Sequence, residues 1–164
     1  MNESDVIRVA ISGCAFLNPR EKLELDEIVS SKQFFRTLSI GTLCKITGRR
    51  LRSLSWNADT ALQQAERQLR FCASRDVQLV SFWDNAYPAA LREIYDPPFL
   101  LFVRGRLPST ERPWTAVVGT RAPTGAALGA AETLCADLAA SGIPVISGLA
   151  RGIDSSAHRG AIRG

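Results

Sequence analysis

Two short stretches near the end of the chain combine glycine, arginine and hydroxyl side chains in a pattern that suits anion binding. They are VVGTRAPTG and ISGLARGID, and in each a glycine directly follows an apolar run and an arginine comes within three residues. Glycine lets the backbone turn tightly and lets a ligand approach its N–H groups, while arginine offers a planar fork for phosphate oxygens. We therefore predict an anion site, for phosphate in particular. The candidate residues are Gly119, Thr120, Arg121, Ser147, Gly148, Arg151, Gly152, Asp154 and His158.

The segments around these stretches predict the elements that position them. WTAVVG and IPVIS are apolar runs typical of strands, TGAALGAAETLCADLAASG predicts an Ala-rich helix closed by Gly142, and GIDSSAHRGAI predicts the start of a second helix. Apolar strands that alternate with helices indicate a parallel sheet covered on both faces, the doubly wound class. In such a sheet ligands bind at the carboxyl ends of the strands, where helix N-termini add N–H donors.

The spacing argues against two common phosphate sites. A dinucleotide fingerprint needs G-x-G-x-x-G, whereas GTRAPTG carries Arg121 in place of the second glycine, and the second strand ends in Ser147 and Gly148 without an acid. The sequence G-x-x-x-x-G-K-[ST] of a P-loop is also absent. An arginine in place of the close-approach glycine favours an extended phosphate backbone as the ligand.

Each residue also has a purely structural interpretation. Gly119 and Gly148 could be turn glycines and nothing more, and Arg121 could pair with a surface acid. Asp154 and His158 lie four residues apart on the predicted last helix, where a local ion pair or a cap is the simpler account. The two stretches taken together are more specific than any single residue.

Neither a catalytic residue nor a metal site is predicted. Ser155 and Ser156 lie near the single histidine of the chain, but no acid is placed to orient that base. The cysteines are far apart without a CxxC pair, so we expect reduced thiols in a cytoplasmic protein, with Cys135 packed in a helix. The cysteines are Cys14, Cys44, Cys72 and Cys135.

The first 75 residues read as a small helical module. Asp5 can cap a first helix, SSKQFFRTL predicts another, and LSIGTLCKITGRRLRSL predicts two short helices with turns at Gly41 and Gly48. A longer helix follows, capped by Asn57 or Asp59, with an apolar stripe at helical spacing. That stripe consists of Leu62, Ala65, Leu69 and Cys72.

The period changes after residue 75. VQLVSF (77–82) predicts a strand, NAYPAALREIY a short helix, 99–103 a second strand, and LPSTERP a linker. The predicted organisation is a helical module at 1–75, followed by a Rossmann-like α/β domain at 76–164. Among 164 residues, 46% are hydrophobic and no apolar run approaches the length of a membrane span. The net charge of +4 and the cluster GRRLR at 48–52 suit a polyanion or a solvated face.

Residues 77–164 resemble the DNA-processing protein A (DprA/Smf) family closely. YPAALREIYDPPFLLFVRG and the long run from AVVGTRAPTG to SSAHRGAI carry the resemblance. The helical module is similar to the sterile-alpha-motif-like (SAM-like) region of that family, although LSIGTLCKITGRRL lacks the usual helix-hairpin-helix glycines. The family's G-[ST]-R motif falls on Gly119, Thr120 and Arg121. Its S-G-x-A-x-G-I-D motif falls on Ser147, Gly148, Ala150, Gly152, Ile153 and Asp154, and Arg151 and His158 complete the signature.

The resemblance implies a non-enzymatic, single-stranded DNA-binding protein of natural transformation, without a cofactor. Similar proteins shield incoming strands, help to load the RecA recombinase and form homodimers. In this chain, the resemblance implies that Arg121 contacts the phosphate backbone and that the second stretch cradles a neighbouring phosphate. Asp154 acting as a cap of helix and loop is the structural alternative.

Family members continue past AHRGAI with further strands and helices, which are expected to hold the dimer and RecA contacts. We therefore expect a truncated member with an incomplete sheet, impaired activity and exposed apolar edges. Two other hypotheses remain. One is a Rossmann-like nucleotide phosphoribohydrolase, for which Glu132 in the Ala-rich helix is a poor catalytic glutamate. The other is an inactive fragment.

Overall fold

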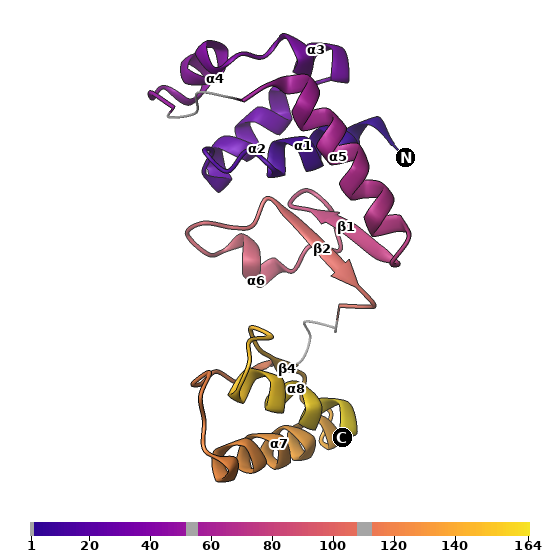
Figure 1. Ribbon diagram of the computed structural model, residues 1–164, viewed down its shortest axis with the longest axis vertical. Coiled ribbons are helices and arrows are strands. Elements are labelled where there is room, and N and C mark those ends of the chain that lie inside the picture. Colours follow the sequence, from indigo (N-terminus) through magenta and orange to yellow (C-terminus); the bar gives the residue numbers. More distant parts are fainter. Residues whose placement is uncertain (1, 52–55, 108–112) are drawn as a thin grey trace. The chain divides into compact units, whose positions relative to one another are not determined.

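The chain forms two compact units, Met1–Leu107 (unit 1) and Pro108–Gly164 (unit 2). A computed structural model describes residues 2–51, 56–107 and 113–164. The fold is mixed α/β, with helices in the N-terminal part and short strands after them (Figure 1). Each unit is described separately below.

Unit 1 opens with a run of helices whose starts are all capped by short polar side chains. The helices are α1 (Glu3–Ser12), α2 (Pro19–Ile28), α3 (Lys32–Thr37), α4 (Ile40–Thr47) and α5 (Ala58–Ala73). Their caps, each accepting a hydrogen bond from a first-turn N–H, are Asn2, Asn18, Ser31, Ser39 and Asn57. The prediction of Asp5 as the first cap is therefore wrong, because Asn2 takes that role and Asp5 lies in the first turn. The prediction of Asn57 as a cap is confirmed.

The segment from residue 39 to 51 differs from the pair of helices predicted for it. Ser39 caps α4, so Gly41 lies in the first turn of this helix rather than in a turn between two helices. The turn at Gly48 is confirmed: it has φ 66°, a left-handed conformation that ends α4. Residues 52–55 of the predicted second helix lie outside the described residues.

The core of unit 1 lies where α5 packs against α1, which Figure 1 shows crossing each other. The predicted stripe of α5 faces this core, since Leu62, Ala65 and Cys72 are buried and Leu69 is partly buried. Phe35 of α3 is fully buried in the same cluster. The 3.6-residue period of the apolar side chains thus positions the longest helix of this unit as expected.

The strands of unit 1 form an antiparallel hairpin, not part of a parallel sheet. β1 (Val77–Ser81) pairs with β2 (Leu100–Arg104), with α6 (Ala89–Arg92) in the connection. A parallel crossover usually runs through an α-helix that packs along the strands. A four-residue helix rises only about 6 Å, whereas a five-residue strand spans roughly 17 Å, so the chain turns back instead. The parallel pairing predicted for this region is therefore wrong.

The hairpin packs with the helices. Phe99 and Leu100 belong to the buried cluster formed by α1 and α5. The Asp26 carboxylate of α2 accepts hydrogen bonds from the Trp83 indole at 3.1 Å and from Arg8 at 3.2 Å. These contacts explain why unit 1 extends to Leu107. The division into domains at 1–75 and 76–164 stays a prediction, and most of the predicted linker LPSTERP lies outside the described residues.

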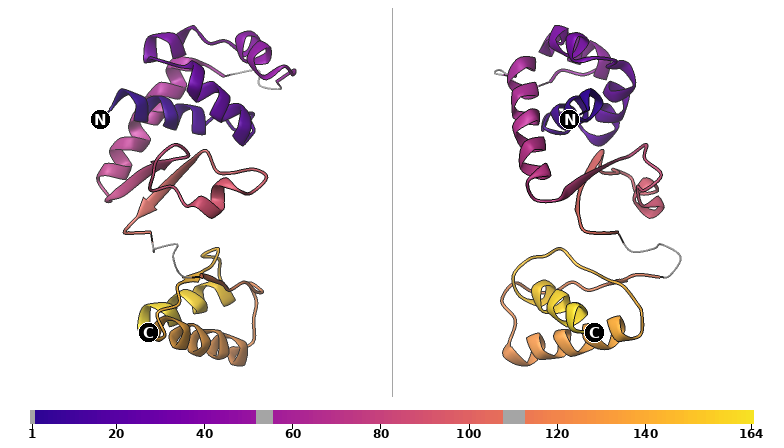
Figure 2. Two further views of the ribbon diagram at one scale, coloured as in Figure 1. Left: turned by 180° about the vertical axis from the view of Figure 1, so that it is seen from behind. Right: turned by 90° about the vertical axis from the view of Figure 1, so that its right-hand side faces the viewer.

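Unit 2 is a strand–helix–strand–helix arrangement. β3 (Thr115–Ala116) is followed by α7 (Gly125–Ala140), and β4 (Val145–Ile146), parallel to β3, is followed by α8 (Ile153–Arg163). The parallel pairing predicted here is confirmed, as is Gly142 just after α7, with φ 72°. The views in Figures 1 and 2 show α8 lying against α7.

The helices of unit 2 meet through small residues. A Cβ at Gly160 would overlap the carbonyl of Glu132, and Cys135 and Ala157 are fully buried beside this crossing. The helix packing predicted for Cys135 is confirmed. The sheet is not covered on both faces by the described residues, because Val118 is 79% exposed and Ile146 is 45% exposed. This exposure agrees with the expected exposed apolar surface of an incomplete sheet, and the doubly wound arrangement stays a prediction.

Candidate nucleic-acid interface

The two predicted stretches form loops that lie side by side at the same edge of the short parallel sheet. The Ser147 hydroxyl donates to the Val117 carbonyl at 2.7 Å, which ties the ends of β3 and β4 together. The Ile153 N–H at the start of α8 donates to the Thr120 carbonyl at 3.2 Å. The structure therefore brings residues 119–121 and 147–154 into one surface. We call the loops 117–124 and 147–152 the corner pair.

The glycines of the corner pair accommodate protein neighbours. A Cβ at Gly119 would lie 2.6 Å from Cγ1 of Ile153, and a Cβ at Gly148 would lie 3.0 Å from Oδ2 of Asp154. Gly152 has φ 91° and ψ −130°, a conformation essentially restricted to glycine. A Cβ there would also overlap the Thr120 carbonyl oxygen. Gly119 and Gly152 thus allow one corner to approach the other, while Gly148 leaves room for Asp154 of its own corner, a reason that spacing alone did not reveal.

Asp154 and Ser155 hold the second loop. Asp154 is 8% exposed, and its Oδ2 accepts a hydrogen bond from the Ala150 N–H at 3.4 Å. The Ser155 hydroxyl donates to the Ala150 carbonyl at 2.9 Å and to the Gly152 carbonyl at 3.3 Å. The geometry matches the loop part of the structural alternative for Asp154, whereas the start of α8 has no side-chain cap hydrogen bond. Leu149, which has φ 57° and is 76% exposed, protrudes from the loop so formed.

His158 lies one turn after Asp154 on α8. Its ring is partly buried, and its Nε2 is buried without a hydrogen-bond partner among the described residues. The Asp154 carboxylate is engaged with the loop, and within the described part of the chain it forms no ion pair with His158. Ser156 is fully buried and accepts a hydrogen bond from Arg159 at 2.7 Å. This arrangement does not orient a base toward a nucleophile.

Arg121 and Arg151 supply the cationic character of the corner pair. Both side chains are exposed, and neither forms an ion pair with any described residue. The arginines of α8 differ, because Arg159 contacts Glu132 at 3.5 Å and Arg163 also pairs with Glu132. Thr120 is exposed next to Arg121. The corner pair therefore presents two unpaired guanidinium groups, one in the loop before α7 and one in the loop before α8, an arrangement that suits a phosphate ligand.

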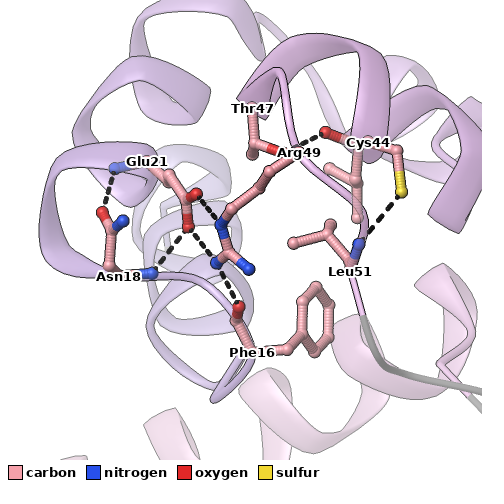
Figure 3. A network of polar contacts seen from close by, with 8 residues as sticks. Phe16, Asn18, Glu21, Cys44, Thr47, Arg49 and Leu51 are labelled. Carbon is pink, nitrogen blue, oxygen red and sulfur yellow. Dashed lines mark hydrogen bonds and ion pairs between the residues drawn. The ribbon is translucent and has the colours of Figure 1, made fainter.

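The basic cluster GRRLR behaves differently, because its first arginine is used inside unit 1. The Arg49 guanidinium donates to Glu21 at 2.5 Å from Nε and at 2.7 Å from Nη2, and Nη2 also donates to the Phe16 carbonyl at 2.9 Å (Figure 3). Glu21 closes a capping box with Asn18 at the start of α2. Arg50 is exposed, and Arg52 lies outside the described residues.

Contact with Arg49 and burial shift the pKa values of Glu21 and Cys14 in opposite directions. The hydrogen bond from Arg49 holds the pKa of Glu21 below its usual value, although burial opposes this shift. Burial raises the pKa of the Cys14 thiol to about 11, so this thiol stays protonated near neutral pH. Cys14, Cys44, Cys72 and Cys135 are all free thiols.

Membrane-spanning helices and groups of metal-ligating side chains are two further features that would indicate a particular kind of site. The described helices include no segment that is long and apolar enough to cross a membrane. Within residues 2–51, 56–107 and 113–164, no group of three or more His, Cys, Asp or Glu side chains is arranged to hold a metal ion.

The chain is similar to several known proteins. Residues 78–164 match the family model of DNA recombination-mediator protein A. The DNA processing protein DprA of Streptococcus pneumoniae is 41% identical over 83 residues, which are 51% of this chain and 29% of that protein. Protein Smf of Borreliella burgdorferi is 28% identical over 158 residues, 93% of this chain and 48% of that protein.

A solved structure extends the likeness to the helices. The X-ray structure of DNA processing protein A from Streptococcus pneumoniae matches with a TM-score of 0.59 at 28% identity, covering 99% of this chain and 54% of that chain. The chain spans less than half the length of the curated relatives it matches. Because the family model covers just over half of the 164 residues, including both corners, the chain belongs to the DNA recombination-mediator protein A (DprA/Smf) family.

Proposed function

We propose that the chain binds single-stranded DNA through the corner pair and acts in natural transformation by shielding incoming strands. The observation that carries this proposal is the pair of exposed, unpaired arginines, Arg121 and Arg151, on a surface within the matched family region. In this proposal the protein is a non-enzymatic cytoplasmic mediator that assists loading of the RecA recombinase. Homodimer formation and the contact with the recombinase are part of the same proposal.

In the proposed fold, the corner pair lies at the ligand-binding edge of the sheet. Unit 2 supplies the first strands and helices of a Rossmann-like domain, and the helices of unit 1 form a SAM-like module. The carboxyl ends of β3 and β4 then mark the ligand edge of the sheet. Arg121 contacts one backbone phosphate and Arg151 a neighbouring one, while Gly119 and Gly152 keep the two loops close enough to act together.

The residues of the second loop have different parts in this proposal. Asp154 acts on the DNA only indirectly, because its carboxylate supports the loop that carries Arg151. Thr120, Ser147 and His158 line or support the same edge, and the buried Nε2 of His158 is a polar atom that the described residues leave unpaired. The Val118 and Leu149 side chains, 79% and 76% exposed, supply apolar surface next to the arginines.

The test is a fluorescence-anisotropy titration of labelled oligo-dT at several salt concentrations. We expect salt-sensitive, sequence-tolerant binding, which Arg121→Ala and Arg151→Ala each weaken by about tenfold, since a charge-assisted contact is worth about 1.5 kcal/mol. Each change should also reduce the salt slope by about 0.7, the value per phosphate for single strands. Arg163→Ala is the control, because Arg163 is paired with Glu132. Equal affinities for wild type and both variants would refute the proposal.

The phosphoribohydrolase alternative has less support. It needs a catalytic glutamate at the phosphate loop, whereas Glu132 lies on α7 in ion pairs with Arg159 and Arg163. Incubation of the protein at high concentration with AMP distinguishes the two proposals. We expect no release of free base, and release that Glu132→Gln abolishes would favour the enzyme.

A further inference from the structure

A row of three side chains crosses the outer face of α5 in unit 1. Arg67, Phe71 and Arg75 are spaced by four residues, which places them on one side of a helix and its immediate extension. All three are exposed, and Phe71 is 60% exposed although it is a large aromatic residue. Figure 2 shows α5 running along one side of unit 1.

The aromatic ring in this row is already part of a cationic stack. The Arg75 guanidinium carbon lies 5.5 Å from the centre of the Phe71 ring. This distance is within the range of a cation–π contact. A guanidinium held over one part of an exposed ring keeps a positive charge next to an apolar, planar surface. Planar bases with a phosphate attached fit such a combination.

The acids of α5 do not neutralise the row. Glu66 pairs with Lys32 of α3 at 2.6 Å, and Asp59 pairs with Arg36 of the same helix at 2.9 Å. Both carboxylates are thus engaged by cations on α3. Among the described residues, Arg67 forms no ion pair. The row therefore carries two cations around one aromatic ring without an acid paired to either.

We propose that Arg67, Phe71 and Arg75 form a second contact for single-stranded nucleic acid, in which a base stacks on Phe71 and the arginines bind the adjacent phosphates. Charge decides between this ligand and a second copy of the chain. Two copies of the row facing each other would oppose four guanidinium groups, whereas a polynucleotide supplies the complementary charge. The inference concerns a surface in a different unit from the corner pair, and it shares only the class of ligand with the proposed function.

A matched control exists in the same unit. Tyr95 is 78% exposed, and the Arg20 guanidinium carbon lies 4.9 Å from its ring centre, so it is also an aromatic residue under an arginine. Its chain neighbourhood is acidic, because Glu93 and Asp96 are exposed on either side. Tyr95→Ala therefore removes a similar stack without the surrounding positive charge.

The experiment uses the full chain and a labelled oligo-dT, with Phe71→Ala, Phe71→Trp, Tyr95→Ala and Arg67→Gln/Arg75→Gln, each also in the Arg121→Ala background. We expect Phe71→Ala to raise the Kd about fivefold or more, the range of one lost base stack, and Phe71→Trp to keep wild-type affinity. The double arginine variant should lower the salt slope by about 1.4, for two phosphates. Tyr95→Ala should change neither quantity.

The outcomes separate this inference from the proposed function. If Phe71→Ala keeps wild-type affinity while Arg121→Ala weakens binding, the proposed contact at the row is refuted and the proposed DNA contact at the corner pair stands. Loss of binding in Phe71→Ala but not in Arg121→Ala overturns the corner pair and supports the row. Absence of binding by folded wild-type protein overturns both. Photocrosslinking of an oligonucleotide containing 5-iododeoxyuridine gives a second readout, in which the peptide bearing Phe71 should carry the adduct.

Discussion

The corner pair of unit 2 and the Arg49 network of unit 1 contain the same kind of residue in opposite situations. Arg49 is held by both oxygens of Glu21 and by a backbone carbonyl, so its charge is used to join α2 to the end of α4 (Figure 3). Arg121 and Arg151 stand exposed without such a partner among the described residues. A cluster of arginines therefore predicts a polyanion site only where no carboxylate of the fold reaches it.

The largest effect is expected for Gly152→Ala, because the added Cβ would sterically obstruct the close approach of the two loops of the corner pair. The new Cβ would meet the Thr120 carbonyl oxygen, and the backbone would keep a φ of 91° that alanine disfavours. We expect unit 2 to lose about 3 kcal/mol of stability. Hydrogen exchange of residues 113–164 measures this loss, and affinity for oligo-dT should fall with it.

Gly129→Ala is the matched control for that change. Gly129 lies inside α7, and no neighbouring heavy atom lies within 4 Å of the position that a Cβ would take there. Alanine at this position should therefore stabilise the helix by about 0.5–1 kcal/mol. If Gly152→Ala were as stable as Gly129→Ala, the interlocking of the corners would not be what requires glycine at residue 152.

Arg49→Ala is expected to have the next largest effect, and on stability alone. It leaves the Glu21 carboxylate, whose side chain is 8% exposed, without its ion-pair partner. Urea denaturation followed by circular dichroism should show a lower midpoint for unit 1. The affinity for oligo-dT should remain that of wild type, in contrast to Arg121→Ala. If Arg49→Ala weakened the affinity for oligo-dT and left stability unchanged, Arg49 would be a DNA contact, and the contrast drawn here with Arg121 would be refuted.

The smallest effect is a pH dependence of the Arg49 network. Because Arg49 lowers the pKa of Glu21, the stabilisation is fully present above the pKa of a glutamate in the unfolded chain, about 4.3, and is lost as the pH falls through the lower folded-state pKa. The stability difference between wild type and Arg49→Ala should therefore shrink as the pH is lowered from about 5 to about 3. Urea titrations across that range measure it. A difference that stays constant would mean that protonation of Glu21 does not control the contact.

Local signals predicted most of the helices, although no helix was predicted where α2 lies. The period of Leu62, Ala65 and Cys72 gave the buried face of α5, and the turn at Gly48 marked the end of α4. The parallel pairing of β3 with β4 was also predictable, because a helix of 16 residues separates two apolar runs. The antiparallel pairing of β1 with β2 was not predictable, because the sequence of the short α6 resembles that of any other helix between strands.

The binding role of the candidate residues stays a prediction, but the structure shows what surrounds each of them. Gly119 and Gly148 were candidates for phosphate approach, whereas the structure fills the space beside them with Ile153 and Asp154. The exposed Phe71 was missed because the apolar stripe of α5 lies on the opposite face and dominates the pattern. The signal that could have found it is the four-residue spacing of Arg67, Phe71 and Arg75.

The sequence by itself indicated most helices and strands (although not α2), the cap of α5 at Asn57, and the arginines placed after β3 and β4. These features depend on residues within one turn or one loop, where spacing is set by backbone geometry. Only the tertiary structure decided that Arg49 is bound by Glu21, 28 residues away, while Arg121 is left exposed. Contacts between distant segments depend on how the elements pack, so the availability of a charge for a ligand is a property of the folded chain.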